Sequence, residues 1–442
     1  MFRQHFRTAA FALVAGMLAC GGAAGRAQSL DSLIRLATQT HPSTRAAQLA
    51  IERVDARSHG LAAWESSRVG FEISSLPPSE PNPFAKGETM LMAEQSIPLF
   101  GQQQAMARAA ALESGVADAD LAATLRQLRA QVETEYYALW LIDREEALIA
   151  ENQHHFDLLY NSIELRYTTG GGTQSDLLRT KLEIERTALE RNEIGLERSE
   201  HLARLNALLS RAPETPVEIA DSLPQRKLPA LDSLAGLLPG NPALARMTAM
   251  ARMSEAEATA QEKMLSPMLM LRGGLGYMPE GHPVREGNLA SMIGEHGATS
   301  ADPMHFGITL GAMLSIPIAP WSRSGPTELA AASRLESARR LEERSAMTQD
   351  LAAELGSAYV AAERARLRRD YYHDTELPLL DRTLTSTLGD FTAQRATLAA
   401  VIDLYHMRTE AYRMFFMQQS EYAMALSRIT ELTGTELTGA DR

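Results

Sequence analysis

The sequence Ser-Ile-Pro-Leu at residues 96–99 returns as Ser-Ile-Pro-Ile at residues 315–318, and this pair decides the fold. It belongs to a longer duplication, in which two more segments return in the same order: 30–33 as 231–234, and 173–178 as 397–402. The chain therefore contains two copies of one long unit. A mostly helical unit duplicated in this way predicts a structure that closes around an axis.

Each copy consists of a helical segment, two short alternating segments and two long helical segments. The predicted helices are 30–64, 102–167 and 173–209 in the first copy, and 231–264, 328–388 and 392–433 in the second. A proline-rich stretch lies between the copies. We therefore divide the chain into five parts: a signal peptide at 1–27, a first repeat at 28–211, a linker at 212–230, a second repeat at 231–434 and a tail at 435–442.

The N-terminus has the pattern of an export signal. Arg3 and Arg7 precede an apolar stretch, and small residues lead up to Ala27. This pattern predicts cleavage after Ala27. The single cysteine, Cys20, lies in an imperfect lipoprotein signal, so a lipid anchor at Cys20 is the alternative.

The composition and motifs exclude several function classes. With 442 residues, of which 45% are hydrophobic, the chain can bury a large core, and its net charge of −12 gives no electrostatic reason to expect a nucleic-acid partner. No apolar run after the N-terminus reaches the roughly 20 residues of a spanning helix, so any membrane crossing must use strands. No glycine-rich phosphate loop follows a strand and no His-Glu-x-x-His pair occurs. We therefore expect neither an enzyme nor a bound cofactor.

Four short segments alternate in character, as half-buried strands do. One set is apolar: Val69, Phe71, Ile73, Leu91, Ala93, Ile97, Leu269, Leu271, Leu275, Tyr277, Phe306, Ile308, Leu310, Leu314 and Ile316. The other set is polar, small or thioether: Arg68, Glu72, Ser74, Met90, Met92, Glu94, Ser96, Met268, Met270, Arg272, Gly274, Gly307, Thr309, Gly311, Met313 and Ser315.

The length and alternation of these segments are typical of transmembrane barrel strands, with apolar residues toward lipid and polar residues toward a lumen. Four strands cannot close a barrel, and unpaired strand edges are forbidden in hydrocarbon. Several protomers must therefore pool their strands. Trp64 and Trp321 flank the outer strands at the end that faces the helices, where an aromatic belt is expected.

The duplicated plan, the junctions at 96–101 and 315–318, and the segment 167–170 before residues 176–178 resemble the TolC-like outer-membrane efflux proteins over nearly the whole mature chain. The resemblance implies a mainly α fold with a small β part. It implies a homotrimer in the bacterial outer membrane, with a twelve-stranded β-barrel continued through the periplasm by an α-barrel. It also implies a passive exit duct whose partners are a periplasmic adaptor protein and an inner-membrane pump of the resistance-nodulation-division type.

The resemblance also suggests where a periplasmic aperture would lie. In such proteins, acidic residues near the start of the last helix of each repeat line the constricted entrance. By alignment Asp403 carries the aperture carboxylate, and Asp176 is its counterpart in the first repeat. The position one turn before Asp403, often acidic in relatives, is Ala400. The alternative is that both are ordinary acids stabilised by a helix dipole.

Methionine indicates a cargo. Of the 20 methionines, five fall on the polar set of the strands: Met90, Met92, Met268, Met270 and Met313. The connection between the last two strands adds Met278, His282, Met292, His296, Met304 and His305. Thioether and imidazole ligands suit monovalent copper or silver. We predict transient metal contacts at the five strand methionines, as in the heavy-metal branch that the chain resembles.

Three alternatives stay open at this point. Methionine also packs adaptably in irregular interiors. A channel for drugs or organic solutes would leave the methionines incidental. Outside the channel class, a secreted coiled-coil binding protein would explain the helices and the signal peptide, but not four alternating strands that share one apolar face.

Overall fold

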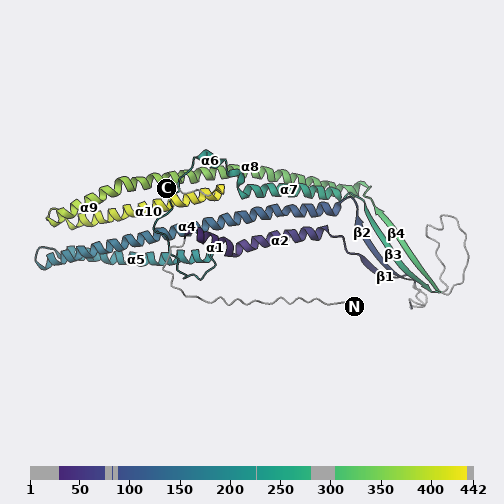
Figure 1. Cartoon of the computed structure of the whole chain (residues 1–442), viewed down its shortest axis with the longest axis horizontal. Coiled ribbons are helices and arrows are strands. Elements are labelled where there is room, and N and C mark those ends of the chain that lie inside the picture. The colour runs from purple at the N-terminus through teal and green to yellow at the C-terminus, as the bar shows by residue number, and fades with distance from the viewer. Residues whose placement is uncertain (1–28, 75–81, 83–87, 225, 280–303, 436–442) are drawn as a thin grey trace.

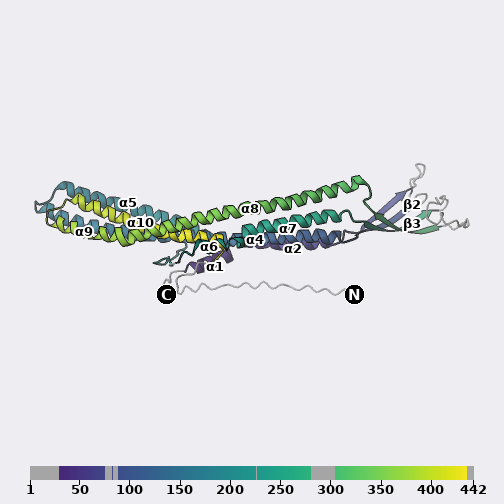
Figure 2. The same ribbon diagram turned by 90° about the horizontal axis from the view of Figure 1, so that it is seen from above.

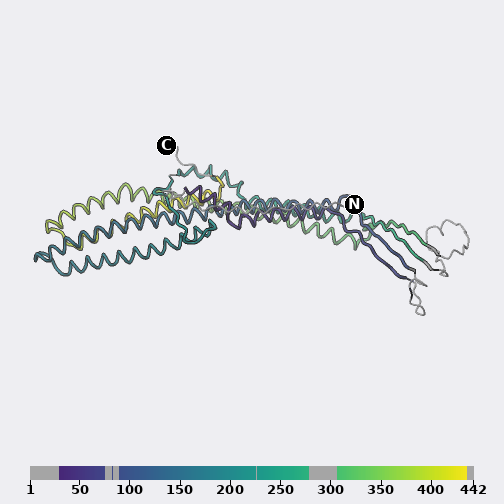
Figure 3. Tube along the Cα trace, turned by 60° about the horizontal axis from the view of Figure 1, so that its bottom comes forward, coloured from purple at the N-terminus to yellow at the C-terminus, as the bar shows by residue number. Residues whose placement is uncertain are grey.

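The structure, a computed structural model, describes residues 29–74, 82, 88–224, 226–279 and 304–435. The predicted signal peptide with Cys20, and all of the tail except Thr435, lie outside the described residues. The molecule is long, with a sheet at one end and two helical hairpins at the other (Figure 1). Figure 3 shows that the strands extend beyond the ends of the helices.

The two halves of the chain repeat one order of elements. The first half contains α1 (Leu30–Thr40), α2 (Pro42–Ala62), β1 (Arg68–Ser74), β2 (Glu88–Pro98), α4 (Gln102–Thr168) and α5 (Gln174–Leu208). The second contains α6 (Leu231–Ala235), the 3₁₀ turn η1 (Leu238–Gly240), α7 (Pro242–Lys263), β3 (Met268–Pro279), β4 (Met304–Ser315), α8 (Pro320–Tyr371), the π turn η3 (Tyr372–Glu376), α9 (Leu377–Thr392) and α10 (Leu398–Thr433). Within these ranges, no helix is both long and apolar enough to cross a membrane.

The predicted opening helices are each broken, which corrects the sequence prediction. His41 is extended between α1 and α2, and its Nδ1 accepts a hydrogen bond from the Ser43 amide. Pro42 then occupies the first helical position, where its missing N–H costs nothing. Asn241 caps α7 before Pro242 in the same way. The residue before a proline is pushed out of the helical region, so the prediction of one continuous helix in each copy was wrong.

The predicted helix 328–388 is also interrupted. It begins earlier, at Pro320, and passes into the π turn η3 before α9. Pro378 lies at the start of α9, where its ring and missing N–H disturb the hydrogen bonds of the preceding turn. A π turn absorbs this disturbance, and the helix continues. In the first copy α4 has no proline and runs unbroken for 67 residues.

The four strands form one antiparallel sheet in the order β1-β2-β3-β4. The two copies meet inside this sheet, where β2 pairs with β3 from Thr89 opposite Tyr277 to Pro98 opposite Met268. Strands β1 and β4 are the two edges. Each copy thus contributes one hairpin, and the hairpins share a single continuous ladder.

Several buried clusters, spaced along the length of the molecule, hold the helices together. Around the middle, α4 buries Trp140, which meets Phe416 of α10 edge to face at 6.0 Å and donates to the backbone oxygen of Asp221 at 3.3 Å. A second cluster joins α8 and α10 around Leu355 and Leu426. Figure 2 shows α8 running from the sheet toward the hairpin that α9 and α10 form. These clusters keep the sheet and the hairpin tips at fixed opposite ends.

Candidate functional site

The register of the sheet separates the strand residues into the two predicted faces. Directly paired residues lie on the same side of a sheet. Five rows cross one side: Pro98, Met268 and Ser315; Ser96, Met270 and Met313; Arg68, Glu94, Arg272 and Gly311; Gly70, Met92, Gly274 and Thr309; and Glu72, Met90, Gly276 and Gly307. We call this side the polar face. The predicted polar set therefore shares one face of the sheet.

The other side, the apolar face, presents its side chains outward. Leu310 is 83% exposed, Phe306 is 78% exposed, and Val69 is 72% exposed. A soluble protein rarely leaves a contiguous apolar surface of this kind uncovered. Trp64 and Trp321, also exposed, lie beside β1 and β4 at the end nearest the helices. This face therefore requires an apolar environment.

The five strand methionines share the polar face but do not gather at one point. Met270 and Met313 are directly paired across β3 and β4, one row from Met268. Met92 and Met90 lie beyond the row of charged residues. The sulfur of Met90 lies above Gly274, 3.4 Å from where a β-carbon would stand there. Met90 thus fills the space over glycine, and the Met270–Met313 pair is the better candidate for a shared ligand.

The connection between β3 and β4 contains the other predicted histidines and methionines. Residues 280–303, with His282, Met292 and His296, lie outside the described residues. Met278 pairs with His305, and Met304 with Pro279, through the backbone. Among the described residues, no group of three or more His, Cys, Asp or Glu side chains is placed to hold a metal ion.

A charged row crosses the polar face between the methionines. Arg272 of β3 forms an ion pair with Glu94 of β2, and Arg68 of β1 is the register partner of Glu94 from the other side. Gly311 occupies the same row on β4, so no side chain there competes with Arg272. The sequence showed these residues to be polar, but only the register brings them into one row.

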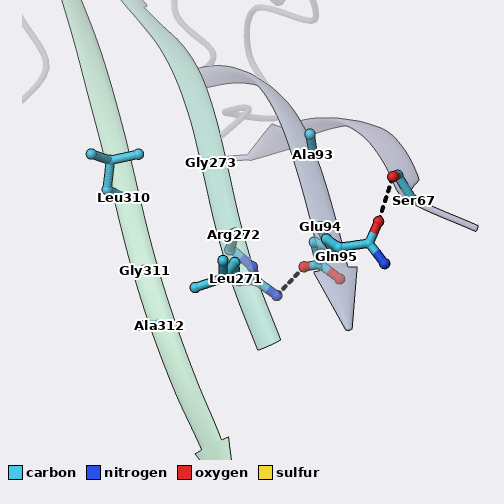
Figure 4. A pocket seen from close by; sticks show the side chains of 10 residues that line it. All are labelled: Ser67, Ala93, Glu94, Gln95, Leu271, Arg272, Gly273, Leu310, Gly311 and Ala312. Atoms are coloured by element: carbon cyan, nitrogen blue, oxygen red, sulfur yellow. Dashed lines mark hydrogen bonds and ion pairs between the residues drawn. The ribbon is translucent and has the colours of Figure 1, made fainter. Parts of the chain in front are cut away.

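A shallow pocket of about 520 Å³ opens over the same part of the sheet (Figure 4). On the apolar face it lies over small residues, Ala93, Gly273 and Ala312, and between Leu271 and Leu310. Ser67 donates to Gln95 Oε1 at 2.6 Å at one side, as the dashed line in Figure 4 shows. The depression is open, so it is a feature of the outward surface and not an enclosed binding site.

Asp176 lies at the start of α5, close to the tip of the first hairpin. The N-cap residue Thr173 donates its hydroxyl to Asp176 Oδ2 at 2.7 Å and accepts from the Asp176 amide at 3.1 Å. This reciprocal arrangement satisfies an amide that would otherwise be unpaired in the first turn. The geometry therefore gives Asp176 a helix-capping role.

Asp403 has different surroundings. Helix α10 begins at Leu398, and its first turn contains no acidic residue. Asp403 lies in the second turn, exposed, between the buried Ile402 and the half-buried Leu404. Within the ranges that the structure describes, its carboxylate forms no ion pair. Asp403 is thus farther from the helix start than dipole stabilisation reaches, and no described side chain neutralises it.

The two hairpin tips are packed against each other. Phe156 and Ile163 of α4 share a buried cluster with Val401 and Ile402 of α10, and Leu177 of α5 packs on its edge. The guanidinium of Arg166 lies 5.1 Å from the ring centre of Phe391. Asp176 and Asp403 thus lie next to members of one cluster, at the same end of the molecule.

A polar network continues this contact toward the middle. Arg408 of α10 contacts Asp381 of α9 at 2.8 Å and Glu151 of α4 at 3.1 Å. Nε2 of His406 lies 3.0 Å from Glu183 of α5. These pairs could not be predicted from the sequence, because the partners of Arg408 and His406 are remote in the chain and show no spacing pattern.

Glu145 of α4 and Arg413 of α10 form a further ion pair, and burial affects the pKa of both groups. Desolvation raises the pKa of the Glu145 carboxyl above its ordinary value, although nearby Arg413 acts in the opposite direction. Burial alone would lower the pKa of Arg413, but the charges of Glu190 and Glu145 outweigh it and raise that pKa. Arg413 therefore stays charged and ties α10 to both helices of the first hairpin.

Comparison with known proteins shows what this fold is similar to. No protein-family model and no curated protein matches the chain. Among solved structures, it is similar to the outer membrane protein VceC of Vibrio cholerae (15% identity, TM-score 0.71, 92% of this chain and 97% of that chain). It is also similar to the CmeC outer membrane channel of Campylobacter jejuni (14%, 0.71, 100% and 95%) and to CusC, a transmembrane channel (17%, 0.68, 90% and 91%). The chain therefore has the fold of outer-membrane channels.

The two aspartates are expected to respond differently to substitution. Asp176→Ala removes both the acceptor for Thr173 and the first-turn charge, so α5 should lose about 0.5–1 kcal/mol of local stability. Asp403→Ala, the matched control in α10, should cause no measurable loss. Amide hydrogen exchange over residues 174–180 and 398–406 measures both effects. Equal loosening of the two helices would contradict the capping role of Asp176.

Proposed function

We propose that this chain is the outer-membrane channel of a tripartite efflux system, a passive exit duct that receives solutes from an inner-membrane pump through a periplasmic adaptor protein. One observation carries the proposal. A four-stranded sheet with an exposed apolar face stands at the end of a long helical bundle, and the solved structures that share this fold are outer-membrane channels. In this channel the polar face would line the lumen and the apolar face would contact lipid.

A homotrimer would pair the two sheet edges that are free in a single copy. In hydrocarbon, each unpaired N–H or C=O costs several kcal/mol, so the free edges of β1 and β4 must be paired. Pairing β1 of one copy with β4 of the next continues the ladder around a closed ring. With four strands from each copy, three copies form the twelve-stranded barrel expected from the resemblance, and the helices continue it into the periplasm. The solved structures with this fold are channels, which supports a role other than that of an enzyme.

At the opposite end, we assign the periplasmic aperture to the hairpin tips. Asp403 is exposed and unpaired in the described part of the chain, whereas Asp176 is engaged with Thr173. Three copies of Asp403 around an axis would repel one another and attract cations. Asp403 is therefore our aperture residue, and Asp176 supports the helix that stands beside it.

A second candidate concerns the cargo. Met270 and Met313 are directly opposed on the polar face, one row from Met268. Side chains at paired positions of neighbouring strands approach closely enough to share a soft ion. This pair favours monovalent copper or silver, whereas an organic solute would use the same methionines only as apolar lining. Met90 and Met92, which lie over or opposite glycines, would add weaker contacts.

The assembly predicts a detergent-dependent trimer. The mature protein should be found in the outer membrane, should need detergent for extraction and should have the mass of three chains. Light scattering coupled to size exclusion, corrected for detergent, measures this mass. A monodisperse, water-soluble monomer would overturn the proposed channel.

The aperture predicts a change in ion selectivity. Asp403→Asn removes three like charges from the entrance, so the preference for potassium over chloride in a planar bilayer should fall by about two- to fivefold. Asp176→Asn, the matched variant, should leave selectivity almost unchanged. If both variants behave like the wild type, Asp403 does not line the narrow part of the duct.

The methionine cargo predicts a selective loss of metal tolerance. Replacing Met90, Met92, Met268, Met270 and Met313 by leucine keeps size and apolar character while removing sulfur. Copper and silver tolerance of cells that depend on this channel should fall, and tolerance of organic drugs should not change. Restoring only Met270 and Met313 should recover most of the loss. Unchanged metal tolerance, with normal amounts of trimer, would assign the methionines to packing.

A further inference from the structure

The charged row contains more positive than negative charge. Arg272 and Glu94 form an ion pair, and Arg68 is opposite Glu94 in the register of β1 and β2. The fourth strand contributes Gly311. Neighbouring strands are about 4.8 Å apart, so all three charges lie within roughly one Debye length at physiological salt. A solute that passes the row meets two arginines and one glutamate from each copy.

Other acidic groups of the polar face are too far away to cancel this excess. Glu72 lies four residues along β1 from Arg68, about 13 Å. Glu88 lies six residues along β2 from Glu94, about 20 Å. Both distances exceed the Debye length of about 8 Å. The rows on either side contribute glycine, serine, threonine and methionine. The row therefore acts as a local positive girdle.

The exposure of these side chains fits a role in the lumen. Glu94 is largely covered, with 21% of its side chain exposed, whereas the side chain of Arg272 is 46% exposed. Arg68 is also exposed. The carboxylate-bearing side chain is thus more covered than the side chains of the two arginines. A passing solute has more access to the guanidinium groups than to the carboxylate.

We propose that Arg68, Glu94 and Arg272 form a selectivity girdle in the barrel lumen that favours solutes bearing an anionic group. The proposal rests on the proposed channel function and specifies its cargo. Three copies give the girdle an excess of three positive charges at the far end of a duct whose entrance bears Asp403. Guanidinium groups bind carboxylate, sulfonate or phosphate groups well. Organic anions are therefore the favoured class of solute, and free metal cations are disfavoured at this point.

The test is the ion selectivity of the full-length trimer in planar bilayers under a potassium chloride gradient. Arg272→Gln and Arg68→Gln should each raise the permeability of potassium relative to chloride by about two- to fivefold. Glu94→Gln should change the ratio in the opposite direction. Benzenesulfonate added on the barrel side should carry less current through Arg272→Gln than through the wild type. A purely structural role would not produce shifts of opposite sign.

Two control variants define the expected result. Arg272→Lys keeps the charge and should keep the wild-type ratio. Arg246→Gln removes a charge from an ion pair with Asp120 in the helical part and should also leave the ratio unchanged. If the arginine variants conduct with unaltered selectivity, the girdle is wrong while the channel stands. If the wild type forms no conductance, the proposed function and the girdle are both wrong.

Discussion

The antiparallel pairing of β2 with β3 is the interaction on which the rest of the structure depends. It joins the two copies of the duplicated unit into one sheet, from Thr89 opposite Tyr277 to Pro98 opposite Met268. Because side chains alternate along a strand, this ladder also decides which residues share a face. A slip of one residue in β3 would move Met268, Met270 and Arg272 to the apolar face. The separation of the polar face from the apolar face therefore depends on this one register.

The same pairing sets the direction of the helices. The repeated Ser-Ile-Pro sequence ends β2 at Pro98 and follows β4 at Pro317, where a ladder N–H is no longer required. After each proline the chain returns along the bundle as α4 or α8 (Figure 1). Both hairpin tips consequently lie at the end opposite the sheet. A single molecule thus has an exposed apolar sheet face at one end and packed helical hairpins at the other.

The sequence predicted the strands and their faces well, because alternation is a local property. The helices were predicted less accurately. The breaks at His41 and at η3 depend on prolines inside otherwise regular patterns, and a helix can either end or deform at such a residue. For Asp176 the sequence offered a helix-dipole role as the alternative, but its contact with Thr173 appears only in the structure. The network around Arg408 and Arg413 was not foreseen, because its partners come together only when the hairpins pack.

The charged row illustrates a limit of another kind. The alternation within each strand placed Arg68, Glu94 and Arg272 on the polar face. That the three residues lie in one row across the sheet follows from the pairing between strands, which no single strand specifies. Register between strands that are remote in the chain depends on the whole sheet. Two features bear on the cargo, the methionine pair and the girdle, and they differ in how far the sequence predicted them. Composition suggested the methionines, whereas the girdle is recognised only from the structure.

The distance between these two features decides how they act together. Met270 and Arg272 are two residues apart on one face of β3, about 7 Å. In water, two unit charges at this distance repel by about 0.6 kcal/mol, a factor of about three in occupancy. Thioethers are neutral and do not offset that repulsion, whereas Glu94, which is paired with Arg272, reduces it. A monovalent metal ion held at Met270 and Met313 would be weakened but not expelled, whereas an organic anion would gain both the positive field and a soft apolar surface from the same residues. Selectivity in such a duct is then the product of several weak steps, each small enough to let the solute leave.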